Sequence, residues 1–228
     1  MTEEKQRKAA RIIGTILFVT LVLSVIYAVV RFIFAPSEIS ADAPYQKIKT
    51  DYLLMITQCA LGILVMMLPT FIARKWKIVV PDTIVIVYFA FLYCAIYLGE
   101  VRNFYYVIPH WDTILHAFSG AMLGALGFVL VDILNKDVRV AVDLSPFFLA
   151  LFAFCFALSV GALWEVYEFS FDAFLGLNMQ KHTTESGVEL VGKAALTDTM
   201  KDIIIDALAA LIVSVLGYVL RKRKYKKQ

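Results

Sequence analysis

Charged residues and cysteines are scarce in this chain, and their scarcity excludes several classes of protein. Of the 228 residues only 18% are charged, while 61% are hydrophobic, and the mean hydropathy is +0.75. This hydropathy lies far above that of an ordinary soluble domain, and several apolar runs reach the roughly 20 residues that span a bilayer, which argues against a soluble protein with a large core. The three cysteines, Cys59, Cys94 and Cys155, lie inside apolar runs, which excludes a disulfide framework and a CxxC metal site. Because no internal repeat is visible, a single membrane domain is expected over residues 1–228.

Six long apolar runs make up most of the sequence. Each approaches the roughly 20 residues with which a helix crosses a hydrocarbon layer about 30 Å thick. Helices are expected because backbone polar groups in lipid must be satisfied within the segment, and the alternating pattern of a barrel strand is absent. The predicted fold class is all-α, a polytopic transmembrane bundle of about six helices. The spans are expected at about residues 12–34, 52–73, 78–98, 113–134, 144–168 and 202–220.

Lysine and arginine in the connections predict the orientation, because positive charge favours the cytoplasmic side. With the N-terminus inside, the cytoplasmic segments hold 15 of the 22 basic residues. These segments are residues 1–11, residues 74–77, the loop with Lys136 and Arg139, and residues 221–227. Both termini are therefore expected to be cytoplasmic in a multi-pass protein of the cell membrane, most simply the bacterial cytoplasmic membrane. The basic tail is interpreted as an anchor to anionic lipid, in preference to a nucleic-acid site.

Ionisable residues gather at the outer ends of the last three predicted spans. The set comprises Asp112 and His116, Glu165 and Glu168, and Asp198, Asp202 and Asp206. Within each group the spacing is three or four residues, so each group lies on one helix face. An ionisable group inside a span costs roughly 2.5–3.5 kcal/mol and marks a functional site by default. We therefore expect His116, Glu165 and Asp206, at least, to share a polar site.

Less specific roles stay open for the other members of this set. Asp112 and Asp198 precede helical runs and would serve as N-caps. Thr199 together with Asp202 fits a capping box, and Glu168 would simply be solvated.

Carboxylates that converge in a low dielectric must be protonated, pair with bases or hold a cation. The bases expected nearby are Arg102, Lys193 and Lys201. One imidazole with several carboxylates suits Zn, Mn or Fe, whereas an all-oxygen subset suits Mg or Ca. The sequence therefore predicts a divalent-metal site with ligands drawn from all seven residues of the set. Glu165, as general base, and His116 are the candidate catalytic residues.

Small residues on the fourth predicted span have a structural interpretation. Gly120, Gly124 and Gly127 recur at spacings of three and four residues, which lets helices approach closely. We expect a tight helix contact at this face.

Residues 95–220 resemble a bacterial family of uncharacterised membrane proteins of the YjdF type and, more distantly, the VanZ-like proteins. The VanZ-like pattern is Asp-Lys-x-x-His, Glu-x-x-Gln and Asp-x-x-x-Asn. The matches are Asp112 with His116, Glu165 and Asp202, and the departures are Thr113 for lysine, Glu168 for glutamine and Asp206 for asparagine. The resemblance implies a cell-envelope setting and an association with glycopeptide resistance. The departures add negative charge and so make a cation site or protonated carboxyls more necessary than in VanZ-like proteins.

Three functions stay open on the sequence. The first is a metal-assisted enzyme acting on a lipid or lipid-linked envelope substrate at the outer face. The second is a non-enzymatic envelope scaffold or antimicrobial-resistance factor, and the third is a proton-coupled transporter. The missing inverted repeat weighs against the transporter. Expected partners are membrane lipid and a lipid-linked substrate, without nucleic acid; the oligomeric state is not predicted.

Overall fold

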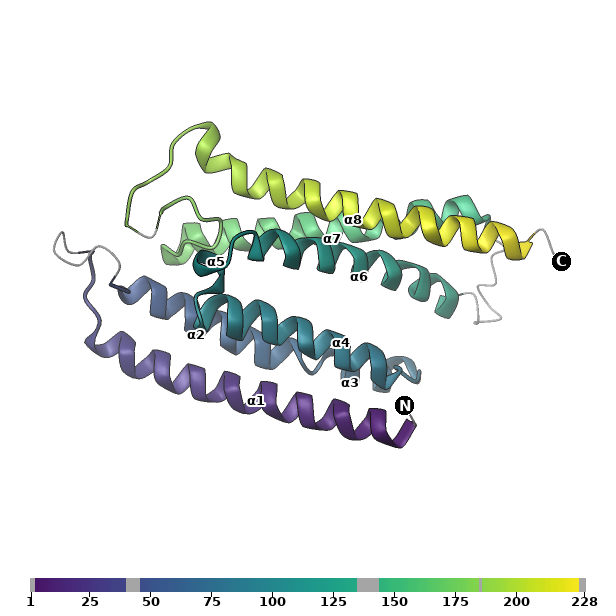
Figure 1. Cartoon of the computed structure of the whole chain (residues 1–228), viewed down its shortest axis with the longest axis horizontal. Helices are drawn as coiled ribbons and strands as arrows, with labels where there is room; N and C mark the ends of the chain where they lie inside the picture. Colours follow the sequence, from purple (N-terminus) through teal and green to yellow (C-terminus); the bar gives the residue numbers. More distant parts are fainter. Residues whose placement is uncertain (1–2, 40–45, 135–143, 185, 226–228) are drawn as a thin grey trace. The chain divides into compact units, whose positions relative to one another are not determined.

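The protein is described by a computed structural model over residues 3–39, 46–134, 144–184 and 186–225 (Figure 1). Six helices in these ranges are long and apolar enough to cross a membrane, which confirms the predicted fold class. They are Glu3–Phe34, Lys49–Trp76, Asp82–Val101, Trp111–Asp132, Pro146–Leu175 and Lys193–Arg223. The loop with Lys136 and Arg139 lies outside the described residues, and the cytoplasmic location of the termini stays a prediction.

The chain divides into two compact units. Unit 1 comprises Met1–Trp111, Leu175–Asn178 and Thr183–Val188, and unit 2 comprises Asp112–Phe174, Met179–His182 and Glu189–Gln228. The elements of unit 1 are α1 (Glu3–Phe34), α2 (Lys49–Val65), α3 (Leu68–Trp76), α4 (Asp82–Leu92), the π-helix η1 (Tyr93–Val101) and α5 (Phe104–Val107). Helix α1 packs along α2 and α4. Leu17, Leu21 and Cys59 are buried in the hydrophobic core of unit 1, so this cysteine behaves as a small hydrophobe.

The second predicted span is divided into two helices at a proline. Pro69 stands in the first turn of α3, where it has no amide hydrogen to donate to the carbonyl four residues earlier. That carbonyl belongs to Val65, and it accepts a hydrogen bond of 2.8 Å from the Tyr88 hydroxyl instead. The tyrosine of α4 thus satisfies the backbone group that the proline leaves open, as hydrocarbon surroundings require.

The third span also departs from a regular α-helix. Its second half is the nine-residue π-helix η1, in which the Arg102 amide donates to the Tyr97 carbonyl, five residues back, at 2.9 Å. The Cys94 carbonyl accepts a hydrogen bond of 3.3 Å from the Trp111 indole nitrogen. The sequence predicted a plain helix here, so the π-helix was missed.

Unit 2 is built on three long helices, α6 (Trp111–Leu134), α7 (Pro146–Leu175) and α8 (Lys193–Tyr225), which lie side by side in Figure 1. A Cβ placed on Gly120 of α6 would lie 2.7 Å from the backbone oxygen of Asp206 on α8. On the next turns, a Cβ on Gly127 would lie 2.6 Å from the Ala153 Cα on α7. The predicted tight contact of this glycine face is therefore confirmed, and it holds α6 against both neighbours.

Candidate metal centre

His116 lies on α6 with one ring nitrogen committed to a carboxylate of α8. Its Nδ1 is 3.2 Å from the Asp206 Oδ2, and both side chains are buried. The Ser119 hydroxyl donates to the other oxygen of Asp206 at 3.2 Å. A carboxylate beside Nδ1 fixes that nitrogen as the N–H donor and leaves Nε2 as the ligand atom, as second partners of metal-bound histidines do.

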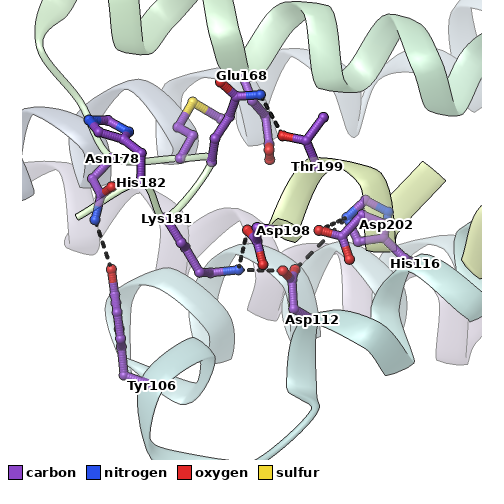
Figure 2. A network of polar contacts seen from close by, with 12 residues as sticks. Tyr106, Asp112, His116, Glu168, Asn178, Lys181, His182, Asp198, Thr199 and Asp202 are labelled. Carbon is purple, nitrogen blue, oxygen red and sulfur yellow. Dashed lines mark hydrogen bonds and ion pairs between the residues drawn. The ribbon is translucent and has the colours of Figure 1, made fainter. Parts of the chain in front are cut away.

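The other ring nitrogen faces two further carboxylates. His116 Nε2 is 3.9 Å from the Asp112 Oδ1 and 4.0 Å from the Asp202 Oδ2 (Figure 2). Each of the three residues offers one ligand atom, and all these atoms lie within 4.8 Å of one another. With Nδ1–H directed to Asp206, a neutral imidazole would point its lone pair at two carboxylate oxygens. A proton on Nε2 or a cation between the three atoms is needed to relieve this repulsion.

The spacing of this triad suits a metal ion after a small contraction. Zinc binds nitrogen and carboxylate oxygen at about 2.0–2.2 Å, so tetrahedral ligand atoms stand roughly 3.3 Å apart. The observed separations of 3.9 and 4.0 Å exceed this by roughly 0.6–0.7 Å, and all three atoms lie within 4.8 Å of one another, so the side chains would have to rotate inward to hold an ion. The donor set of one imidazole and two carboxylates suits Zn or Mn.

Buried oxygens without hydrogen-bond partners lie in the same unit. Glu165 on α7 is 4% exposed and Asp202 is 2% exposed. Both side-chain oxygens of Glu165 and the Oδ1 of Asp202 have no partner among the described residues. The charges acting on Glu165 include those of His116 and Asp202. Since buried polar atoms are normally satisfied, these three oxygens are open positions for a cation or a proton.

Lys181 supplies the positive charge at the outer side of the cluster. Its Nζ contacts the Asp112 Oδ2 and lies 3.7 Å from the Asp198 Oδ2 (Figure 2). Burial acts to lower the pKa of Lys181, but the two carboxylates outweigh it and raise that pKa above its usual range. Lys181 is therefore a fixed cation.

Asp172, near the C-terminal end of α7, holds the segment that carries Lys181. Its two oxygens accept hydrogen bonds from the Met179 amide at 2.8 Å and the Gln180 amide at 3.0 Å. The Gln180 side chain donates to the Thr199 hydroxyl on α8 at 2.7 Å. The loop is thus tied to both helices on either side of the cluster, which fixes where the ammonium group stands.

The structure separates the seven predicted ligands by role. Asp112, His116 and Asp202 form the triad, and Asp206 pairs with His116. Glu165 is buried, and its two side-chain oxygens have no partner among the described residues. Asp198 pairs with Lys181, and Glu168 accepts a hydrogen bond of 2.9 Å from the Trp164 indole nitrogen. Their assignment as metal ligands stays a prediction.

Two interpretations from the sequence are wrong. Helix α8 begins at Lys193, so Asp198 and Thr199 lie inside the helix and form neither an N-cap nor a capping box. Helix α6 begins at Trp111, so Asp112 is not an N-cap either. Lys193, one of the expected bases, is exposed. Lys201, another expected base, acts on Asp198. Among the described residues, the lysine in ion pairs with Asp112 and Asp198 is Lys181, which was not among the expected bases. Lys181 could have been identified from the sequence as the lone lysine in the connection before the helix that carries Asp198, Asp202 and Asp206, since those carboxylates need a positive partner.

Comparison with known proteins gives a family and no activity. Residues 15–223 match the family described as "Predicted membrane protein (DUF2238)". A protein of Thermotoga maritima, described as uncharacterized, is 31% identical over 121 residues, which cover 53% of this chain and 54% of that relative. The chain thus spans about half the length of that relative. No solved structure matches. Because the family match covers well over half of the chain, the protein belongs to this family of predicted membrane proteins.

Proposed function

We propose that this membrane protein holds one divalent cation, Zn or Mn, on Asp112, His116 and Asp202, and that it is a metal-assisted enzyme. Asp206 is the residue that orients His116 toward the cation. A divalent cation with an open position supplies a nucleophilic water at neutral pH. Glu165, buried with both oxygens open, is the proposed proton acceptor.

One observation carries the cation proposal. His116 Nε2 points between two carboxylate oxygens while its Nδ1 is already paired with Asp206. This places one nitrogen and two oxygen atoms around a single point, with the imidazole tautomer set by a fourth residue. Glu165 adds a second argument, because a buried carboxylate without a partner is costly unless it is protonated or a cation compensates it.

The surroundings of Glu165 support a lipid or lipid-linked substrate. On the same turns of α7, Leu163 is 66% exposed, Val166 58% and Phe169 63%. Large apolar side chains exposed on a membrane-spanning helix contact lipid. An acyl or polyprenyl chain in the bilayer would therefore lie against α7, the helix that carries Glu165.

The setting proposed for this reaction is the outer face of the bacterial cytoplasmic membrane. The distribution of lysine and arginine supports that orientation. The resemblance to YjdF-type and more distantly to VanZ-like proteins supports a cell-envelope substrate, and this part of the proposal rests on the resemblance alone.

The decisive test is the metal content of protein purified in detergent with added Zn or Mn. Wild type should carry about one ion per chain by elemental analysis, and His116→Ala should carry almost none. Asp132→Asn is the matched control, because it removes a carboxylate from α6 that pairs with Arg221 away from the cluster. Absence of metal from the wild type would overturn the proposal and favour a scaffold role.

A further inference from the structure

Asp112 bridges two positions for positive charge. One carboxylate oxygen, Oδ1, faces His116 Nε2, and the other, Oδ2, contacts the Lys181 ammonium group. The Oδ2 of Asp198, one turn earlier than Asp202 on α8, lies 3.7 Å from the same ammonium nitrogen. A carboxylate that bridges two cations is the arrangement found in sites that hold two metal ions about 3.5–4 Å apart.

Unit 2 has more carboxyl groups than one divalent cation and one lysine could neutralise if all were ionised. Six carboxylates converge there: Asp112, Glu165, Glu168, Asp198, Asp202 and Asp206. One divalent cation compensates two of these charges and Lys181 compensates one. Lys201 also acts on Asp198. The carboxylates left over need protons or a further cation in this low dielectric.

Buried oxygens without partners among the described residues occur in the same acidic cluster, independently of the charge count. The Asp202 Oδ1 and both oxygens of Glu165 are buried without partners among the described residues, and neither side chain is more than 4% exposed. The proposed cation between Asp112, His116 and Asp202, here called the inner ion, would be bound by the Asp202 Oδ2. The Oδ1 of the same carboxylate has no partner among the described residues and is available to a second cation. Carboxylates commonly ligate through both oxygens in this way.

We infer that Lys181 occupies the place of a second divalent cation, between Asp112 and Asp198, and competes with that cation for it. The inference rests on the proposed function, because the inner ion is bound through the same Asp112 carboxylate. The lysine is carried by the loop before α8 and not by a membrane helix. Its ammonium therefore acts as a tethered counter-ion that keeps the centre mononuclear.

Titration with Mn²⁺ tests this directly, because stoichiometry and magnetic coupling can be measured without a substrate. Wild type should bind one ion per chain, and Lys181→Ala should bind two, with spin coupling between neighbouring Mn²⁺ ions in electron paramagnetic resonance. Lys181→Arg keeps the charge and should bind one. Lys193→Ala, which removes an exposed lysine at the start of α8, is the matched control and should also bind one.

A double variant identifies the second position. Adding Asp198→Asn to Lys181→Ala should return the stoichiometry to one and abolish the coupling, because Asp198 contributes an oxygen at the position that Lys181 occupies. Should Lys181→Ala prove unstable, Lys181→Gln keeps most of the side-chain volume and should show the same second ion.

The outcomes separate the two proposals. Failure of the wild type to bind any Mn²⁺ would overturn the proposed function. If the wild type, Lys181→Ala and Lys181→Gln each bind one ion, the inference of a second cation position at Lys181 is wrong. The proposed function would be unaffected by that result. No ion in the variants, with an ion in the wild type, would show that Lys181 braces the inner site, which also overturns the inference.

Discussion

Gly161 on α7 lies directly against the carboxylate of Asp206 on α8. A Cβ at this glycine would stand 2.5 Å from the Asp206 Oδ2, the same oxygen that pairs with His116 Nδ1 at 3.2 Å. Only a residue without a side chain leaves room for this carboxylate between the helices. The glycine therefore positions the histidine indirectly, through the residue that orients it.

Gly161→Ala should displace Asp206 and disturb both packing and cation binding. Overpacking of a tight site costs about 1–3 kcal/mol, so the thermal unfolding midpoint in detergent should fall and the affinity for Mn²⁺ should weaken. Ser159→Ala, at an exposed position of the same helix, is the control and should change neither. Normal Mn²⁺ affinity in Gly161→Ala would show that the Asp206 carboxylate has another way to reach His116.

Asp206→Asn tests the orienting role without changing the shape of the side chain. The amide oxygen can still accept the His116 Nδ1–H bond, but the negative charge behind the imidazole is lost. Loss of such a partner weakens metal binding by about 10–100-fold, and isothermal titration with Zn²⁺ or Mn²⁺ measures it. Asp132→Asn, which changes a part-buried pair with Arg221, should bind like the wild type. Unchanged affinity in Asp206→Asn would reduce Asp206 to a packing residue.

Glu165→Gln should have opposite effects with and without metal. In chelator, removing a buried charge that has no partner should leave the protein at least as stable as wild type. With the ion at 100 times its dissociation constant, wild type gains about 2.7 kcal/mol from binding, and the variant should gain less. The thermal unfolding midpoint in detergent, measured with chelator and with Mn²⁺, gives both the stability without metal and the stabilisation gained from the ion. Equal destabilisation of the variant in both conditions contradicts a role at the cation.

The contribution of Lys181 to stability should be lost at alkaline pH. A folded-state pKa raised above the unfolded value of about 10.4 means that the ion pair stabilises fully below that pH. The stabilisation then disappears as the pH rises through the folded pKa. The difference in stability between wild type and Lys181→Met in chelator should be constant up to about pH 10 and shrink above it. A difference that grows with pH would contradict the ion pair as its source.

Cysteine labelling tests the orientation of the chain. A cysteine placed at the exposed position Ser186 should react with a membrane-impermeant maleimide added outside intact cells. A cysteine at Lys75 should react only after the membrane is opened, because residues 74–77 are predicted to be cytoplasmic. The background should lack Cys155, the exposed native cysteine. The reverse pattern would invert the topology and with it the outer-face assignment.

The fold class and the residues of the acidic cluster followed from the sequence, because hydrocarbon imposes simple rules. Apolar runs of spanning length become helices, and helical spacing of three or four residues brings Asp112 with His116 onto one face. Six spanning helices in the described ranges confirm that level of prediction.

The pairing of Lys181 could not be predicted in the same way. Its position depends on Asp172 accepting two loop amides, and nothing in residue spacing indicates how a long connection folds back onto a helix. The start of α8 was missed for a related reason. Thr199 and Asp202 fit a capping box, but the helix continues outward past them to Lys193.

The π-helix η1 affects how relatives of this chain should be aligned. A π turn accommodates one more residue than an α turn over the same rise, and here it places the Cys94 carbonyl within reach of Trp111. A relative with one residue fewer in this segment would restore α geometry, and every later residue on the helix would rotate by about 100°. A gap within Tyr93–Val101 in an alignment of relatives would then indicate that different side chains face the unit 1 core. Identical residues aligned after such a gap would not occupy the same position in the two structures.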